Sequence, residues 1–162
     1  MVGMRRILGL LTVGLSAAAI VWFLGMRTKN PLVINAQRRF NRSFVNPREL
    51  GRAGAPGANN SVIEHRGRKS GRTYRTPLEA VPTEDGFAMV SVYGSDSDWV
   101  QNVLAEGSAT IVRDGQRHSV AHPELVPYEQ VNRYFPEATV RAHRAFDVRE
   151  GLLVHTVPEP SI

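Results

Sequence analysis

The longest apolar pattern in the sequence is a run of twenty uncharged residues, Ile7 to Met26. About 20 apolar residues are enough to cross a bilayer as a helix. Cations flank the run on both sides, and Trp22 and Phe23 lie near its end, where interfacial aromatic residues are common. The pattern predicts an N-terminal membrane anchor over residues 1–29, with a transmembrane helix. The alternative is a signal peptide and export, with Ala17-Ala18-Ala19 as the cleavage site.

Charge is distributed unevenly around this run. Five lysines and arginines lie within the twenty residues after it, and only Arg5 and Arg6 precede it. Because cytoplasmic loops carry the excess of Lys and Arg, we expect a single-pass protein of the cell membrane with its domain on the cytoplasmic face. Residues 1–52 have a net charge of +8 and residues 53–162 a net charge of −3. This favours contact with membrane lipid over nucleic acid, which would need cations on the folded domain.

A short basic amphipathic helix is predicted after the anchor. Asn30-Pro31 suits an N-cap and a first helical residue, and the helix is expected to end before Pro47. Two placements of its apolar side chains remain open, on anionic lipid or on the domain. With the loop that follows, the helix forms a linker over residues 30–60, ahead of a domain over residues 61–162. The apolar residues at helical spacing are Val33, Ala36, Phe40 and Phe44.

Apolar runs separated by turn signals predict a mainly β domain. The expected fold is α+β, with about six antiparallel strands and short helices, closed or half-closed into a small barrel. A helix from Trp99 is expected to stop at Gly107, and Asp96 and Asp98 are interpreted as its N-capping residues. Asp114-Gly115 predicts a type I′ hairpin turn. The expected strands cover residues 62–65, 74–81, 87–93, 109–113, 116–125 and 151–157, and two further helices cover 128–134 and 137–146.

The composition limits the chemistry that the side chains can supply. The sequence has no cysteine, which excludes disulfides, thiolate nucleophiles and Cys-based metal sites. There is no Gly-x-Ser-x-Gly elbow for a serine nucleophile. His118 and His122 would lie roughly 13 Å apart on a strand, too far to share a metal. No metal site is therefore expected, and the histidines are interpreted as surface or hydrogen-bonded core residues.

A glycine-containing basic turn, Gly67-Arg68-Lys69-Ser70-Gly71-Arg72, lies between the first two predicted strands. Glycines let the backbone turn tightly and approach a ligand closely, and successive N–H groups in such a turn can bind an anion. The three cations add charge-assisted donors. The turn is not a P-loop, because a strand and not a helix follows it. It is either a phosphate- or carboxylate-binding turn or a solvated basic hairpin.

This turn, the stretch Arg75-Thr76-Pro77-Leu78 after it, and the later segments Tyr93-Gly94-Ser95-Asp96 and Asp98–Leu104 resemble the deazaflavin-dependent nitroreductase family in order and spacing. That family consists of actinobacterial split β-barrel proteins related to pyridoxamine-phosphate-oxidase-like flavoproteins. The resemblance covers roughly residues 61–125 and the last strand. It implies a split β-barrel and a reductase that uses reduced coenzyme F420, an 8-hydroxy-5-deazaflavin.

The resemblance also implies a cofactor site. The basic turn holds the phosphate and acidic tail, the stretch after the turn lies along the deazaflavin ring, and the later loop and helix close the other side. Hydride leaves a ring carbon of the cofactor, so no protein base is required. Family members place tyrosines near the acceptor, which makes Tyr128 and Tyr134 candidates here. The implied cofactor-binding residues are Arg68, Lys69, Ser70, Arg72, Thr76, Pro77, Leu78, Tyr93, Gly94, Trp99 and Asn102.

Two functions from different classes follow from this resemblance. The first is a membrane-tethered oxidoreductase that transfers a hydride from reduced F420 to a small or lipophilic acceptor, of the quinone or nitro-compound type. The second is a non-catalytic module that binds a deazaflavin, a flavin or a lipid, since relatives of this barrel bind flavin mononucleotide, haem or lipid. The number of cations in the turn suits a polyanionic tail, so F420 is expected to bind more tightly than flavin mononucleotide. The oligomeric state is left open.

Overall fold

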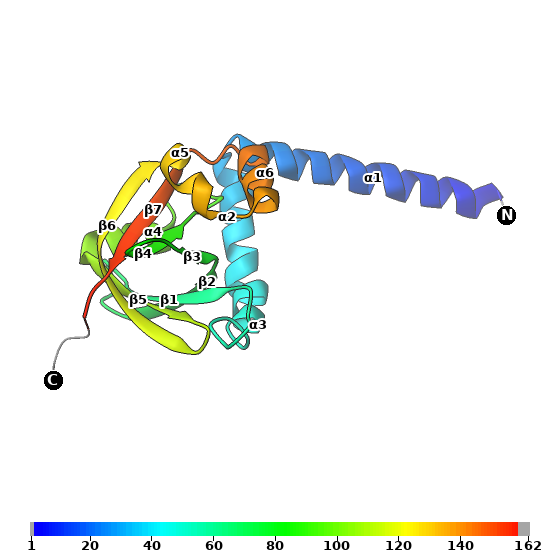
Figure 1. Cartoon of the computed structure of the whole chain (residues 1–162). Coiled ribbons are helices and arrows are strands. Elements are labelled where there is room, and N and C mark those ends of the chain that lie inside the picture. Colours follow the sequence, from blue (N-terminus) through cyan, green and yellow to red (C-terminus); the bar gives the residue numbers. More distant parts are fainter. Residues whose placement is uncertain (1, 159–162) are drawn as a thin grey trace.

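The computed structural model describes the backbone of residues 2–158 and the side chains of residues 15–158. Its centre is a seven-stranded sheet in the order β2-β1-β5-β6-β7-β4-β3, with every neighbouring pair antiparallel. β2 and β3 are separated in the chain by Glu79 alone, yet they lie at the two ends of this order. The sheet therefore curls until its edges approach each other (Figure 1). The prediction of a mainly antiparallel, half-closed barrel with short helices is confirmed.

The strands are β1 (Ser61–Arg66), β2 (Thr73–Leu78), β3 (Ala80–Pro82), β4 (Gly86–Met89), β5 (Ser108–Arg113), β6 (Gln116–Pro127) and β7 (Glu150–Thr156). The helices of the barrel are α4 (Asp98–Glu106), α5 (Tyr128–Val131) with a 3-10 turn (Asn132–Tyr134), and α6 (Glu137–Ala145). The predicted local signals are confirmed where they depend on backbone chemistry. Gly107 ends α4 with φ 74°. Asp114 and Gly115 both have positive φ, 50° and 76°, as a type I′ turn requires.

Two of the predicted strands differ from the structure by more than two residues at one end. The strand expected over residues 74–81 is broken at Glu79, because β2 pairs with β1 at one edge of the sheet and β3 pairs with β4 at the other. This break raises the number of strands from six to seven. The strand expected over 87–93 ends at Met89, because its partner β7 begins only two residues before Leu152, which lies opposite Met89.

The hydrophobic core lies in two clusters on the two faces of the sheet. β4 is buried along its whole length. Phe87 and Met89 point into an inner cluster that includes Val100 and Val103 of α4. Ala88, between them, points into an outer cluster with Tyr128, Val131 and Phe135 beneath α5 and α6. The alternation of a strand thus explains why β4 reads as a continuous apolar run.

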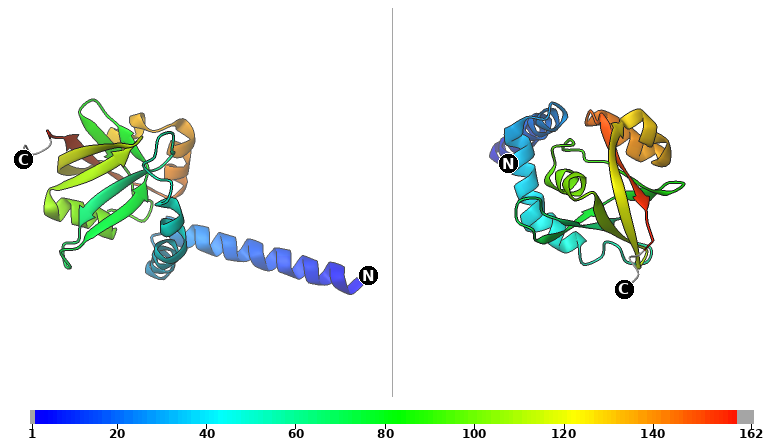
Figure 2. Two further views of the ribbon diagram at one scale, coloured as in Figure 1. Left: turned by 90° about the horizontal axis from the view of Figure 1, so that it is seen from below. Right: turned by 90° about the vertical axis from the view of Figure 1, so that its left-hand side faces the viewer.

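The N-terminal segment lies along one side of the barrel. α1 (Val2–Arg27) extends away from it, and α2 (Pro31–Phe40) runs across the direction of α1 (Figures 1 and 2). Asn30 caps α2 as predicted, accepting a hydrogen bond from the N–H of Leu32 at 3.0 Å. α2 ends at Phe40, before Pro47 as expected, but the helical backbone continues through a π-helical segment (Asn41–Val45) into α3 (Asn46–Glu49). Pro47 lies in the first turn of α3, where its missing N–H is not needed.

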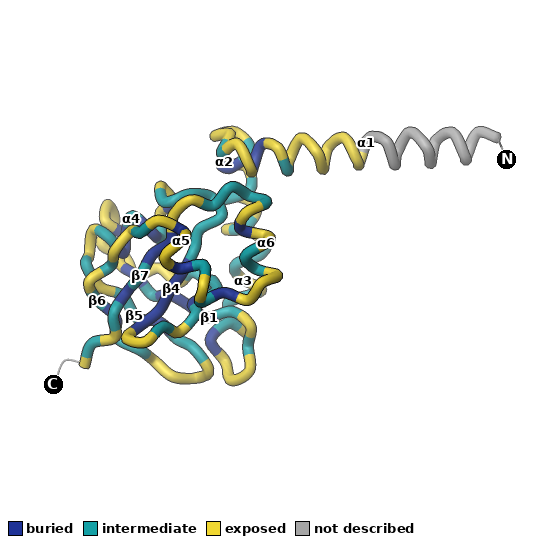
Figure 3. Tube along the Cα trace, turned by 45° about the horizontal axis from the view of Figure 1, so that its top comes forward, coloured by how far each residue is buried: buried dark blue, intermediate teal, exposed yellow. Residues whose placement is uncertain are grey.

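The part of α1 whose side chains are described is mostly exposed, as the yellow segment of Figure 3 shows. Among the described residues, no helix is long and apolar enough to cross a membrane. The predicted transmembrane helix is therefore not supported by that part of the chain. Residues 7–14 of the predicted span lie outside the residues whose side chains the structure describes.

Candidate cofactor site

The basic turn joins β1 to β2 and is closely packed around Gly67. The N–H of Gly67 donates to the carbonyl of Arg72, and the N–H of Gly71 to the carbonyl of Gly67, both at 2.8 Å. A Cβ on Gly67 would lie 2.5 Å from the ring of Tyr74 and 2.6 Å from Ser70 Oγ. Ser70 Oγ is itself hydrogen-bonded to Tyr74 Oη at 3.0 Å. Ser70 thus helps to close the turn.

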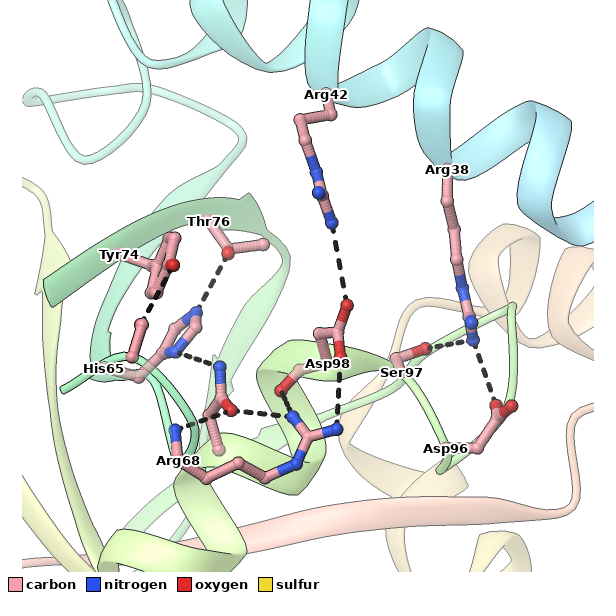
Figure 4. A network of polar contacts seen from close by, with 11 residues as sticks. Arg38, Arg42, His65, Arg68, Tyr74, Thr76, Asp96, Ser97 and Asp98 are labelled. Carbon is pink, nitrogen blue, oxygen red and sulfur yellow. Dashed lines mark hydrogen bonds and ion pairs between the residues drawn. The ribbon is translucent and has the colours of Figure 1, made fainter. Parts of the chain in front are cut away.

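Arg68 fastens this turn to α4. Its backbone N–H and its Nη1 both donate to Asn102 Oδ1, at 3.1 and 2.7 Å. Its Nη2 lies 3.2 Å from Asp98 Oδ1 (Figure 4). Asn102 is buried, with 6% of its surface exposed. The predicted site residues Arg68 and Asn102 are therefore brought together, and they position the turn.

Lys69 and Arg72 are the other two cations of the turn, and both are exposed. Within the described part of the chain, neither side chain forms an ion pair. Arg68 already has a carboxylate partner, so the free positive charge of the turn belongs to Lys69 and Arg72. These two residues are the ones available to bind an anion.

His65 is a member of this network that sequence reasoning missed. It is buried, with 4% of its surface exposed. Its Nδ1 lies 3.2 Å from Asn102 Nδ2, and its Nε2 lies 3.1 Å from Thr76 Oγ1. Because an amide NH2 can only donate, Nδ1 accepts and Nε2 carries the hydrogen. His65 thus links two predicted site residues, Thr76 and Asn102, and its ring stacks on Tyr74 at 6.0 Å between centroids.

The acidic loop before α4 has a different role from the one predicted. Asp96 and Asp98 do not cap the helix; Ser97 occupies the N-cap position and makes no side-chain capping bond. Both carboxylates instead bind arginines of the N-terminal segment. Asp96 pairs with Arg38 at 3.0 Å, and Asp98 pairs with Arg42 at 3.6 Å in addition to the turn. Sequence spacing gave no sign of these contacts, because the partners are more than fifty residues apart.

A cavity of about 830 Å³ lies between this N-terminal segment and the barrel. Tyr93 and Gly94, both predicted site residues, line it together with Lys29 and Arg38. Lys29 Nζ donates to the carbonyls of Val92 and Phe146, at 2.7 and 2.9 Å. Burial lowers the pKa of Lys29, and the carboxylate of Asp147 partly opposes this. The cavity therefore combines charged side chains of both signs with one wall of the predicted site.

Comparison with known proteins decides the family. The family model described as F420H(2)-dependent quinone reductase matches residues 36–154, well over half of the chain. The chain belongs to the F420H2-dependent quinone reductase family. The resemblance to F420-dependent split-barrel enzymes is thereby confirmed, and with it the prediction of an F420-dependent oxidoreductase whose cofactor is coenzyme F420.

Several solved structures are similar to the chain at low identity. One is described as an F420-H2 dependent reductase, FDR-A, with 18% identity over 60% of this chain and 94% of that one, and a TM-score of 0.44. Another, described as a domain-swapped dimer, has 16% identity over 75% and 98%, and a TM-score of 0.46. A conserved hypothetical protein of Mycobacterium tuberculosis has 12% identity over 65% and 85%, and a TM-score of 0.45. These values add nothing to the family assignment. No curated protein matches the chain.

The residues of the turn fit the cofactor of the quinone reductase family. Its phosphate and acidic tail need cations without other partners, which Lys69 and Arg72 supply. Arg68, held by Asn102, keeps the turn in one position against α4. The fit therefore rests on two free cations and on one cation that is fixed in place.

The remaining predicted residues divide into two groups in this reductase. Leu78 and Trp99 are half-buried and pack against the inner core cluster, and Pro77 is half-buried on β2. Tyr128 and Tyr134 belong to the outer cluster under α5 and α6 and do not join the network around the turn. Tyr128 Oη is hydrogen-bonded to His143 Nδ1 at 2.9 Å, and Tyr134 Oη donates to Glu84 at 2.6 Å.

The network predicts an acid-sensitive step in the stability of the protein. Burial lowers the pKa of His65 to about 4, and the Asp98 carboxylate opposes this only weakly. As the pH falls below about 6.5, the unfolded chain binds the proton before the folded protein does. The contribution of neutral His65 to the free energy of unfolding is therefore fully present above pH 6.5. As the pH falls toward 4, the free energy of unfolding decreases by about 2–3 kcal/mol.

Titration of the His65 imidazole by NMR checks this directly, and urea unfolding between pH 4 and 7 checks its consequence. His65→Gln keeps polar contacts to its neighbours but has no titrating group, so its stability should depend less on pH over this range. An imidazole that titrates near 6.5 would contradict the buried, neutral state.

Proposed function

We propose that this protein oxidises reduced coenzyme F420 at a membrane and passes the hydride to a quinone-type acceptor. The observation that carries the proposal is a pair of cations, Lys69 and Arg72, that form no ion pair with any described residue and lie on a turn that Arg68 and Asn102 hold against α4. The family match over residues 36–154 supports the same chemistry.

The bound deazaflavin supplies the hydride, and the protein supplies binding, orientation and electrostatics. Lys69 and Arg72 would bind the acidic tail at the turn. Tyr93 and Gly94, on the cavity wall, would line the space for the ring and the acceptor. Reduction of a quinone places negative charge on an oxygen, and the same cavity is lined by Arg27 and Lys29, two cations that form no ion pair within the described part of the chain. Fixed charges of this kind stabilise a developing anion without reorganisation.

The membrane location is supported by the N-terminal segment. The uncharged run of residues 7–26 is followed by five cations within twenty residues. At its barrel end Met26 is buried and Phe23 packs against Phe146, but Leu15, Ile20 and Val21 before them expose 71%, 58% and 65% of their surface. Tethering at a bilayer would raise the effective concentration of the enzyme near a lipophilic quinone. The domain then lies on the cytoplasmic face, where the positive charge lies.

Turnover of a quinone tests the proposed activity. Purified full-length protein is mixed with reduced F420 and a short-chain, water-soluble quinone, and the return of oxidised F420 is followed by absorbance. We expect oxidation that requires both protein and quinone. Binding of F420 without turnover would assign the non-catalytic module instead. Tighter binding of flavin mononucleotide than of F420 would contradict the proposal.

Lys69→Ala is expected to weaken F420 binding and to leave the fold intact. One charge-assisted contact contributes about 1.5–3 kcal/mol, or roughly ten- to a hundredfold in affinity. Fluorescence titration measures the affinity. Arg141→Ala is the matched control, because it also removes one exposed cation but from α6, where Arg141 pairs only with Glu137. Equal affinities in the two variants would make the turn a solvated hairpin.

A further inference from the structure

The helix formed by α2 and the π-helical segment after it packs on the barrel with its polar side. Arg38 and Arg42 bind the carboxylates of the acidic loop, and Asn41 Nδ2 donates to Tyr93 Oη. Ile34 is the buried apolar residue of α2. The acidic loop explains this orientation, because two carboxylates attract the arginine side of the helix. Most of the apolar side chains expected on one side of this helix therefore do not pack against the barrel.

The opposite side of this helix exposes large apolar side chains. Leu32 exposes 81% of its surface, Phe40 53% and Phe44 55%. The two phenylalanine rings contact each other, with centroids 5.4 Å apart. We call these three residues, together with Arg39 and Arg48, the α2 outer face; it begins on α2 and continues through Phe44 of the π-helical segment to Arg48 of α3. Both arginines are exposed and form no ion pair within the described part of the chain.

The chemistry of the α2 outer face matches an anionic lipid surface. Aromatic and leucine side chains beside arginines are the pattern of helices that lie in the plane of a bilayer interface. Residues 27–52 hold seven lysines and arginines and a single acid, Glu49. That carboxylate accepts a hydrogen bond from Asn60 at 3.1 Å. Each exposed cation near an anionic surface adds attraction for the phospholipid headgroups.

The joint between α1 and α2 is held firmly enough to fix the orientation of the barrel. A Cβ on Gly25 would clash with Val33 at 2.4 Å, so the two helices are in close contact. Trp22 Nε1 donates to Gln37 at 2.8 Å. Arg27 donates to two carbonyls at the end of α6, and Lys29 donates to two carbonyls of the barrel. Since α2 runs across the direction of α1 (Figure 1), an inserted α1 would lay α2 along the surface of the bilayer.

We propose that the α2 outer face binds the interfacial region of an anionic bilayer. The proposal rests on the membrane location proposed above and does not depend on hydride transfer. It has a consequence for the site, because the cavity of about 830 Å³ is lined by Arg27, Lys29 and Pro31 at the same joint. The cavity would then lie behind α2, and its end at this joint would be the part nearest to the bilayer, where a lipophilic acceptor could enter.

The chain has no cysteine, so a single introduced thiol can be labelled without background. In full-length Phe44→Cys, an environment-sensitive fluorophore is expected to shift to the blue and to be protected from aqueous iodide on phosphatidylcholine–phosphatidylglycerol vesicles. Pure phosphatidylcholine vesicles should give a smaller shift. Glu124→Cys is the control, because it is exposed on β6, away from α2 in Figure 1, and its label should stay in water.

Two results would overturn the proposal. In the first, the protein sediments with the vesicles while the labels at positions 44 and 124 remain equally accessible to iodide. In the second, the blue shift at position 44 appears without vesicles and grows with protein concentration, which would assign the face to a second copy of the chain. Quinone-dependent oxidation of reduced F420 is measured on the same samples. Its absence beside a vesicle-dependent shift would contradict the proposed activity and leave the lipid contact standing.

Discussion

Replacing Gly86 with alanine is expected to lower the free energy of unfolding by about 3 kcal/mol or more. Gly86 begins β4 and lies opposite His155 of β7. A Cβ at this position would lie 1.9 Å from the carbonyl oxygen of Val154 and 2.8 Å from the Cα of His155. Both are backbone atoms that cannot rotate away, so relief requires the two strands to separate. Because β4 is buried on both faces, that separation disturbs both core clusters.

Urea unfolding of the two proteins measures this difference through the midpoint and slope of the transition. Gly51→Ala is the matched control, since its nearest new contact is a carbonyl oxygen at 3.4 Å and its φ is not positive. This control should change stability by no more than about 0.5 kcal/mol. If the two variants unfold at the same urea concentration, β4 and β7 are not in the close contact described here.

Features that depend on neighbouring residues were predictable from the sequence. The hairpin at Asp114-Gly115 follows from the positive φ that only such residues adopt without strain. Gly107 stops α4 for the same reason. Asn30 caps α2 because its side chain reaches the N–H two residues later. In each case the deciding interaction spans only a few residues, so its signal is present in a short window.

Features that depend on distant contacts were not predictable in the same way. The break at Glu79 arises because the chain passes from one edge of the curled sheet to the other. The orientation of α2 arises because Arg38 binds Asp96, which is fifty-eight residues away in the sequence. His65 reads as one strand residue among several, and its partner Asn102 lies thirty-seven residues further on. The family motif identified the residues of the turn but not the network that holds them.

That network makes Asn102 a residue whose loss should affect cofactor binding as much as the loss of a cation from the turn. In Asn102→Ala the backbone N–H of Arg68 and the Nδ1 of His65 both lose their partner in a buried site. An unsatisfied buried group costs about 1–3 kcal/mol, so stability should fall. The turn would no longer be held against α4, which should reduce the affinity for F420 by about ten- to a hundredfold. Gln101→Ala, the next residue on the same helix, loses only a bond to the carbonyl of Ser95 and serves as the control.

Asn102→Asp separates the positioning role from a general loss of stability. A carboxylate at this position can still accept both hydrogen bonds from Arg68, and the opposite charge strengthens them. It also lies beside His65 Nδ1, where an opposite charge favours the protonated imidazole and raises its pKa from about 4. We therefore expect Asn102→Asp to retain F420 affinity while its His65 titrates at higher pH, and Asn102→Ala to lose affinity. Fluorescence titration and NMR of the imidazole measure the two effects independently. If Asn102→Ala bound F420 as tightly as Gln101→Ala, Arg68 would not depend on Asn102 for its position, and the turn would bind the cofactor without support from α4.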